Sequence, residues 1–335
     1  MEPDAVRDVG REPHGSSDDP DIVDFSANTN PRIPSGVREV YADALEAART
    51  YPVEPPRAYR EAAADYVDCE PTSVIPTPGG LAAIRLTIEV SVSAGDDVLV
   101  PAPSFAEYAR EVRLQGANPV FVPHDEVLDA DPSEYALAVV CNPNNPTGEC
   151  YDPDALRDFA DACADAGTPL LADEAFLGFT DDPSLAGRDG VVVARSLTKL
   201  FGLPGIRAGF AVATGDQSER LAAARRTWNL GAPALAVGEH CMRDAAFVAD
   251  TRRRVREERA RLRDALTERF DVHPSDAPFL LLDVGDHGVQ YVVETARERG
   301  VAVRDATTFR GLDSHVRVAV RTPAENDRLV EALDV

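Results

Sequence analysis

The segment Val191-Val-Val-Ala-Arg-Ser-Leu-Thr-Lys199-Leu-Phe-Gly-Leu-Pro-Gly-Ile-Arg207 decides how this chain is interpreted. Lys199 is the only lysine among 34 lysine and arginine residues. A lysine can act as a neutral amine that forms a Schiff base, whereas an arginine stays protonated. An unusual composition can also leave one lysine on a surface, but here an apolar run precedes Lys199 and a Gly/Pro-rich turn follows it. This context predicts a strand that leads into a functional loop, with imine chemistry at Lys199.

Short, continuously apolar runs alternate with helical patterns outward from this segment. Such runs are typical of strands covered on both faces, and helices between them predict a mainly parallel sheet in a three-layer α/β/α domain. The runs are 97–100, 119–122, 137–141, 169–172 and 190–194, and the helical patterns include 36–49, 57–67, 80–93 and 152–166.

The pattern changes near Ala232, where a long arginine-rich helical stretch continues to Phe270. Strands near 279–283 and 316–320, with a helix between them, predict a smaller α+β domain. We therefore expect a large domain over 36–231, a small C-terminal domain over 232–335, and an N-terminal segment 1–35 that joins the small domain.

Composition excludes several classes of protein. The chain carries 58 acidic residues and a formal charge of −24, which repels nucleic acids and anionic membranes and is typical of proteins adapted to high salt. The five cysteines form no Cys-x-x-Cys pair, so we expect neither a metal site nor a disulfide framework. No apolar run approaches the roughly 18 residues of a membrane span, and the start lacks a basic region followed by an apolar core, so we expect a cytoplasmic protein.

Polar and glycine residues follow several predicted strands, at the edge where α/β sheets bind ligands. The turn Thr77-Pro-Gly-Gly80 precedes a predicted helix and can hold a phosphate, or it is only a tight turn. The loop 141–148 offers amide side chains for a phenolic oxygen, or it is an ordinary Asn/Pro/Gly turn. Asp173 ends an apolar strand, where a carboxylate can pair with a protonated ring nitrogen or simply face solvent.

Three motifs together resemble the fold-type I pyridoxal-phosphate enzymes, the aspartate aminotransferase superfamily. They are Asn144-Asn145-Pro146-Thr147-Gly148, Asp173-Glu174-Ala175-Phe176, and Ser196-Leu-Thr-Lys199 with Arg207 eight residues on. The resemblance extends from about Phe25 to the C-terminus and implies pyridoxal 5'-phosphate as cofactor, an imine at the catalytic Lys199, and Asp173 on the ring nitrogen. It further implies Asn145 on the ring hydroxyl, Ser196, Arg207 and the amides of Gly79, Gly80 and Leu81 on the phosphate, Phe105 stacked on the ring, and Tyr51 reaching a neighbouring subunit of a homodimer.

Within that superfamily the opening Phe25-Ser-Ala-Asn28-Thr-Asn30-Pro31 is similar to histidinol-phosphate aminotransferases and to threonine-phosphate decarboxylases of cobalamin biosynthesis. The motifs at 24–28, 103–108, 173–176 and 317–322 are closer to the decarboxylases, and Phe176 stands where the aminotransferases usually have tyrosine, although this change could equally be one of packing. The resemblance therefore predicts decarboxylation of L-threonine O-3-phosphate to (R)-1-amino-2-propanol O-2-phosphate. The alternatives are a histidinol-phosphate or related aminotransferase, and a non-catalytic regulatory protein, which the retained Lys199, Asp173 and Asn145 disfavour.

Two arginines are candidates for the anionic groups of such a substrate. In Val316-Arg-Val-Ala-Val-Arg321 the period of two places Arg317 and Arg321 on one face of a strand. The resemblance places Arg317 at the family's carboxylate-binding position, and we expect Arg321 to bind a phosphate, although an arginine of this chain is more often a surface residue. The further substrate-binding candidates are His14, Asn28, Asn30 and Arg32.

Overall fold

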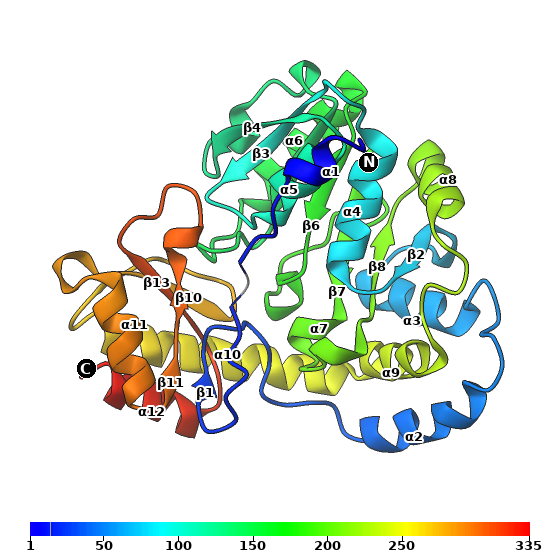
Figure 1. The fold of residues 1–335 in the computed structure, drawn as a ribbon. Helices are drawn as coiled ribbons and strands as arrows, with labels where there is room; N and C mark the ends of the chain where they lie inside the picture. Colours follow the sequence, from blue (N-terminus) through cyan, green and yellow to red (C-terminus); the bar gives the residue numbers. More distant parts are fainter. Residues whose placement is uncertain (14) are drawn as a thin grey trace.

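A seven-stranded sheet forms the centre of the larger part of the molecule (Figure 1). The computed structural model describes residues 1–13 and 15–335. The strand order is β2-β8-β7-β6-β5-β3-β4, and β8 alone runs antiparallel to its neighbours. The strands are β2 (Val74–Thr77), β3 (Asp97–Ala102), β4 (Asn118–Pro123), β5 (Leu137–Cys141), β6 (Leu170–Asp173), β7 (Val191–Ser196) and β8 (Gly209–Val212).

Helices cover both faces of this sheet because its strands are apolar on both sides. Alternate residues of one strand, such as Val139 and Val140, belong to separate cores on the two faces. One face packs on α4 (Gly80–Ser91), α5 (Glu107–Leu114) and α8 (Gly215–Ala224), and the other on α3 (Arg57–Val67), α6 (Pro153–Ala166) and α9 (Ala232–Arg243). The predicted three-layer α/β architecture with a mainly parallel sheet is confirmed.

A second, four-stranded antiparallel sheet lies beside the first, in the order β12-β13-β10-β9 (Figure 1). Its strands are β9 (Asp271–Val272), β10 (Phe279–Asp283), β12 (Arg304–Asp305) and β13 (His315–Ala319). The accompanying helices are α10 (Ala245–Leu266), α11 (Val289–Glu298) and α12 (Pro323–Ala332).

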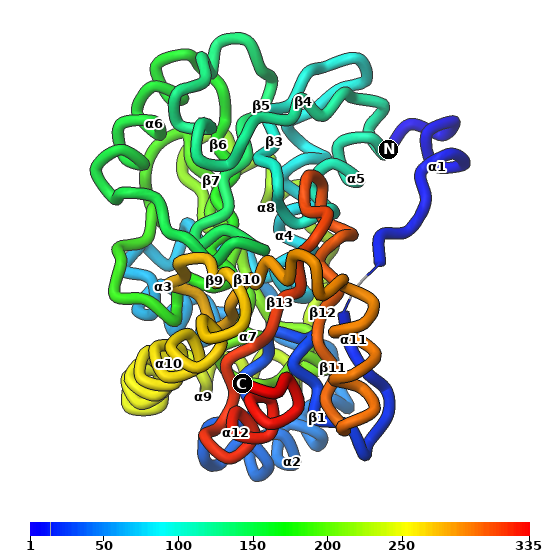
Figure 2. Tube along the Cα trace, turned by 90° about the vertical axis from the view of Figure 1, so that its left-hand side faces the viewer, coloured from blue at the N-terminus to red at the C-terminus, as the bar shows by residue number. Residues whose placement is uncertain are grey.

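The N-terminal segment reaches both parts of the molecule. Its short helix α1 (Ala5–Asp8) lies against α5, and β1 (Val23–Asp24) pairs in parallel with β11 (Val301–Ala302). Figure 2 shows this segment passing along one side of the molecule between the two sheets. The next helix, α2 (Val37–Ala47), packs against α9.

Two elements differ from the sequence-based expectation. Strand β8 was not predicted, because its four residues follow the Gly/Pro-rich loop after Lys199. The long helical stretch from 232 is broken at Asp244, whose carboxylate accepts a hydrogen bond from the Phe247 amide (2.9 Å) and so caps a new helix, α10, which ends at Leu266.

The described residues, 1–13 and 15–335, contain no helix with the length and hydropathy needed to cross a membrane. Within the same ranges, no group of three or more His, Cys, Asp and Glu side chains is arranged to hold a metal ion.

Candidate active site

A cavity of about 330 Å³ opens at the edge of the large sheet where β3, β5, β6 and β7 end. The parallel strands bring their carboxyl ends to this edge, so residues far apart in sequence meet there. The cavity also borders the second sheet and the N-terminal segment. Its lining includes Asn28, Gly80, Leu81, Phe105, Asn145, Asp173, Phe176, Ser196, Lys199, Arg207, Arg304, Phe309 and Arg317.

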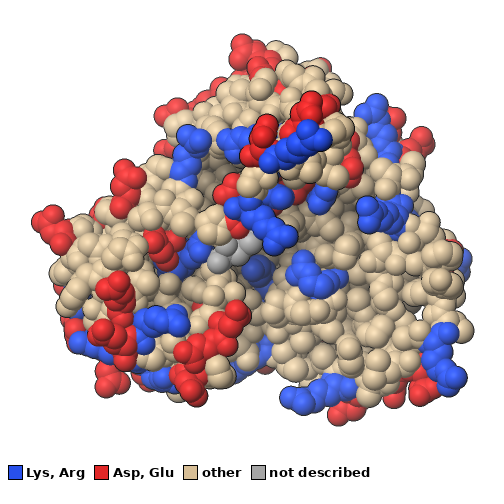
Figure 3. Space-filling model, in the orientation of Figure 1, with Lys and Arg blue, Asp and Glu red and all other residues tan. Residues whose placement is uncertain are grey.

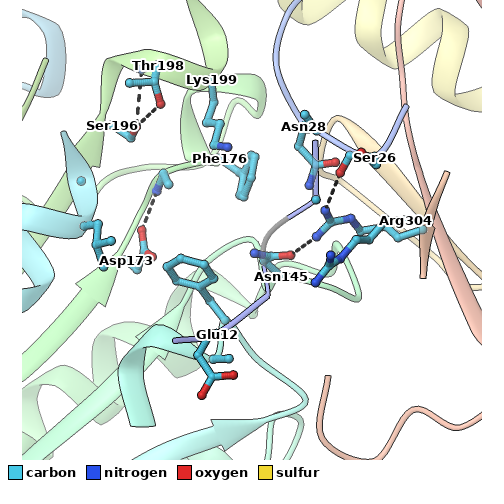
Figure 4. Close-up of a pocket in the computed structure, with 18 of the residues that line it drawn as sticks. Glu12, Ser26, Asn28, Asn145, Asp173, Phe176, Ser196, Thr198, Lys199 and Arg304 are labelled. Atoms are coloured by element: carbon cyan, nitrogen blue, oxygen red, sulfur yellow. Dashed lines mark hydrogen bonds between the residues drawn. The ribbon is translucent and has the colours of Figure 1, made fainter. Parts of the chain in front are cut away.

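Lys199 lies on the short helix α7 (Leu197–Leu200), directly after β7. Its Nζ lies 6.0 Å from the centroid of the Phe176 ring, and Figure 4 shows the side chain extending toward that ring. Burial lowers the pKa of Lys199 to about 8, helped by the positive charges of Arg317 and Arg207 and opposed by Asp173. About a tenth of this amine is therefore neutral and nucleophilic at pH 7, far more than for a lysine in water.

Asp173, the last residue of β6, is a buried carboxylate held by two donors. The Tyr108 hydroxyl donates a hydrogen bond to its Oδ2 (2.5 Å), and the Ala175 amide donates to its Oδ1 (3.0 Å). Burial raises the pKa of Asp173, while these two hydrogen bonds act in the opposite direction. The carboxylate is thus fixed in position at the floor of the cavity.

The turn between β2 and α4 forms a cradle with Ser196 and Arg207. Gly79 has φ +93° and ψ 168°, a conformation open to glycine, and a Cβ there would lie 2.7 Å from Nη2 of Arg207. A Cβ on Gly80 would lie 3.1 Å from Cβ of Ser196. The first amides of α4 have no partner within the helix, so the cradle offers N–H donors, a hydroxyl and a guanidinium to one anion.

Arg317 crosses the cavity from β13 toward the loop after β5. It donates hydrogen bonds to Oδ1 of Asn145 and to the carbonyl of Ser26 (3.2 Å). Its buried Nε and the buried Oδ1 of Asn28 have no hydrogen-bond partner among the described residues. Unpaired polar atoms inside a cavity are suited to a polar ligand.

Arg304 lies beside Arg317 because the two residues are directly paired between the antiparallel strands β12 and β13. Directly opposed residues project to the same face of a sheet, and both side chains line the cavity. Arg304 donates hydrogen bonds to the Pro13 carbonyl (2.9 Å) and to Thr308 (2.8 Å). The proximity of Arg304, after burial, lowers the pKa of Arg317.

Several predicted substrate ligands lie elsewhere. Arg321 is beyond the end of β13 and bonds to Glu325 (2.7 Å) and the Asp24 carbonyl (3.0 Å), so the expectation that it shares a face with Arg317 in the cavity is wrong. The chain has by then turned into the capping box of α12. Asn30 is buried against Leu200, Thr251 and Arg254, Arg32 does not line the cavity, and His14 lies outside the described residues.

Tyr51 also lies outside the cavity. Tyr51 is 77% exposed, and its ring stacks on that of Trp228, with centroids 4.4 Å apart. Its predicted role requires a second subunit and stays a prediction.

Sequence reasoning missed two residues of the site. Tyr108 lies in the motif 103–108, but no helix is predicted there, so no pattern in the sequence places its side chain beside Asp173. Arg304 offered no signal, since a two-residue strand cannot be recognised from its pattern.

The residues of the cavity fit pyridoxal 5'-phosphate. The Gly79–Gly80–Ser196–Arg207 cradle suits its phosphate, and Phe105 lines the space above the floor. Asp173 supplies an acceptor for the ring nitrogen, and the lysine amine can form an imine with the aldehyde.

Comparison with known proteins agrees with this geometry. Residues 20–333 match the sequence model of the family described as Aminotransferase class I and II. Histidinol-phosphate aminotransferase 2 of Archaeoglobus fulgidus is 32% identical over 94% of this chain and 93% of its own length. A Caldanaerobacter subterraneus protein, named as a candidate threonine-phosphate decarboxylase, is 30% identical over 84% of this chain and 82% of its own. The crystal structure of L-threonine-O-3-phosphate decarboxylase from Porphyromonas gingivalis superposes with a TM-score of 0.84 at 26% identity, covering 93% of this chain and 98% of that one.

Proposed function

Because the chain belongs to the class I and II aminotransferases and is a pyridoxal-phosphate enzyme, we propose that it decarboxylates L-threonine O-3-phosphate to (R)-1-amino-2-propanol O-2-phosphate, for cobalamin biosynthesis in the cytoplasm. The observation that carries this proposal is the direct pairing of Arg304 with Arg317 at the cavity. Two adjacent cations match a substrate that carries both a carboxylate and a phosphate.

Each arginine has a separate place in the proposed binding mode. Arg317 is buried and bonded to Asn145, close to the expected position of the reacting carbon, so it binds the carboxylate. Arg304 is more exposed and bonds to the N-terminal segment, so it binds the phosphate at the cavity mouth. Arg304 takes the phosphate-binding role that was expected of Arg321, because Arg321 is held by its hydrogen bond to Glu325.

The bound cofactor supplies a ring that accepts the electron pair left at Cα when a bond breaks. Asp173 keeps that ring nitrogen protonated through its negative charge. The two arginines orient the substrate, and orientation decides which Cα bond breaks. Lys199 is placed to deliver a proton from Nζ to Cα after carbon dioxide leaves, since its lowered pKa lets the amine exchange protons near neutral pH.

Phe176 supports the decarboxylase over the aminotransferase. Its ring contacts Phe279 edge-on, with centroids 5.1 Å apart, and lies beside Nζ of Lys199. It therefore offers no hydroxyl to the ring oxygen of the cofactor, which leaves the amide of Asn145 for that oxygen.

Histidinol-phosphate aminotransferase is the second candidate, because that is the name of the relative at 32% identity. Histidinol phosphate lacks a carboxylate, so Arg317 would then serve the carboxylate of an amino-group acceptor such as 2-oxoglutarate.

The two functions are separated by one experiment. Purified protein in high salt is supplied with pyridoxal phosphate and L-threonine O-3-phosphate, and carbon dioxide and aminopropanol phosphate are measured by mass spectrometry. A parallel reaction contains histidinol phosphate and 2-oxoglutarate. Carbon dioxide without glutamate supports the decarboxylase; glutamate without carbon dioxide establishes the aminotransferase instead.

We further propose a homodimer. Large apolar side chains are exposed over α2 and the loop that follows it, and Trp228 lies against the same loop through its stack on Tyr51. A second copy would cover this surface and receive Tyr51 at its own cofactor phosphate. The exposed side chains are Tyr41, Leu45, Tyr51, Val53 and Trp228.

A further inference from the structure

A second cavity, of about 400 Å³, lies directly beside the catalytic one. The two cavities share five lining residues from both parts of the molecule: Glu12, Phe105, Ala106, Thr308 and Phe309. The outer cavity is otherwise formed by the end of β3, by α5 and β4, and by the loop that follows Thr308. The boundary between the two cavities therefore includes two aromatic residues, Phe105 and Phe309, and one acid, Glu12.

Two arginines in this outer cavity lie over one aromatic ring. The guanidinium carbon of Arg310 is 3.9 Å from the centroid of the Phe121 ring, and that of Arg113 is 5.9 Å from it. Arg113 comes from α5, Phe121 from β4, and Arg310 from the loop before β13. Both guanidinium groups are therefore attracted to the face of the same ring.

Neither guanidinium is neutralised within the described residues, 1–13 and 15–335. Glu12 and Asp313 line the same cavity, yet neither Arg113 nor Arg310 forms an ion pair or a side-chain hydrogen bond there. In contrast, Arg110, one turn before Arg113, bonds to Glu107 and Glu111. In a chain with 58 acidic residues, two adjacent unpaired arginines are available to an external anion.

The chemistry of this pair favours a phosphate group. Planar guanidinium groups bind phosphate oxygens in pairs, and Arg310 stays oriented by its stack on Phe121. The whole chain has a formal charge of −24 and repels anions at long range, so local positive charge at the mouth increases the rate of their capture. Figure 3 shows basic side chains around the central hollow of one face, with acidic side chains among them.

We propose that this outer cavity, the Arg113–Arg310 vestibule, is a docking site for the phosphate monoester of the substrate before it enters the catalytic cavity. The inference rests on the proposed function only in that the substrate carries a phosphate, which is true of both candidates above. Phe309 lines both cavities and the next residue, Arg310, lines the outer one, so the two sites are adjacent.

The test compares Arg113→Gln, Arg310→Gln and the double variant with the wild-type holoenzyme, at the lowest salt concentration that keeps all of them folded by circular dichroism. We expect kcat/KM for the phosphorylated substrate to fall by roughly tenfold in the double variant, with the loss in KM rather than kcat. In about 1 M salt the difference in kcat/KM between wild type and variants should shrink, because the Debye screening length is then only about 3 Å. Arg297→Gln, on exposed α11, is the matched control for one lost charge.

If kcat/KM falls equally in Arg297→Gln, or is unchanged in the double variant, the proposal that the vestibule binds phosphate is wrong. Arg310→Lys keeps the charge without the planar group, and a value between wild type and Arg310→Gln supports phosphate binding by the guanidinium.

Binding of inorganic phosphate to the holoenzyme, measured by calorimetry, tests the site without turnover. The double variant should bind one phosphate fewer per chain than the wild type, and equal stoichiometry overturns the proposal. If the wild type turns over neither candidate substrate, the proposed function is wrong. The phosphate-binding result still shows whether the vestibule binds phosphate.

Discussion

Replacing Gly79 by alanine is expected to weaken cofactor binding by roughly 5- to 150-fold. Gly79 has φ +93° and ψ 168°, a region of backbone conformation that is essentially restricted to glycine. An added Cβ would also lie 2.7 Å from Nη2 of Arg207, the guanidinium of the phosphate cradle.

The magnitude follows from the conformational cost. A side chain in this region costs about 1–3 kcal/mol. The apoenzyme can relieve that cost by shifting the turn and Arg207, but cofactor binding must restore the cradle, so the cost appears in the dissociation constant. About 1.4 kcal/mol corresponds to tenfold in that constant.

The assay is a titration of apoenzyme with pyridoxal phosphate, followed by the absorbance of the bound cofactor. Gly205→Ala is the matched control: Gly205 lies two residues before Arg207, has open space where its Cβ would be, and has no positive φ. If Gly79→Ala binds the cofactor as tightly as the wild type does, or if Gly205→Ala loses as much affinity, the cradle does not bind the cofactor phosphate.

Four further predictions concern the cavity. Lys199→Arg should abolish the absorbance band of lysine-bound cofactor, because a guanidinium forms no imine, and a retained band with full turnover would remove Lys199 from its role. Because burial and Arg317 lower the pKa of Lys199 to about 8, cofactor uptake by the apoenzyme should accelerate from about pH 7 to about pH 9 as the amine loses its proton; a flat rate profile would contradict this. Arg304→Gln should reduce kcat/KM roughly 10- to 150-fold through loss of a charged hydrogen bond, whereas Arg321→Gln should lower only the unfolding free energy; the reverse order would restore Arg321 as the phosphate ligand. Tyr108→Phe keeps the ring but removes its hydrogen bond to a buried carboxylate, and should lower the unfolding free energy by about 1.5–3 kcal/mol in chemical denaturation; unchanged stability would show that this bond contributes nothing.

The fold was predictable where the sequence pattern is local. Strands buried on both faces are continuously apolar, and the helix predicted over 57–67 matches α3 (Arg57–Val67). Strand β8 escaped prediction because four residues after a glycine-rich loop carry too little pattern. The break at Asp244 depends on one side-chain cap, which hydrophobic periodicity does not report.

The site was predictable where motifs adjoin strand ends. Asp173, Asn145, Ser196 and Lys199 meet in one cavity because parallel strands end at one edge of the sheet. Arg304 is different, because its position depends on pairing with β13, a contact between strands that no local pattern encodes.

The misplacement of Arg321 has a simple cause. The alternation of side chains was extended past Ala319, where β13 ends. Beyond that point the chain bends toward α12, and Arg321 follows the bend to Glu325.

The parallel pairing of β1 with β11 sets an order of events during synthesis. Val23 pairs with Val301, about 280 residues later, so the early strand leaves the ribosome long before its partner exists. At roughly 5–20 residues per second, that delay is roughly 14 to 56 seconds. Asn30 likewise accepts its hydrogen bond from Arg254 only after that later residue has been synthesised. The larger sheet can therefore form during translation, while the entrance to the cavity is assembled last, when the final strands emerge and the beginning of the chain docks on them.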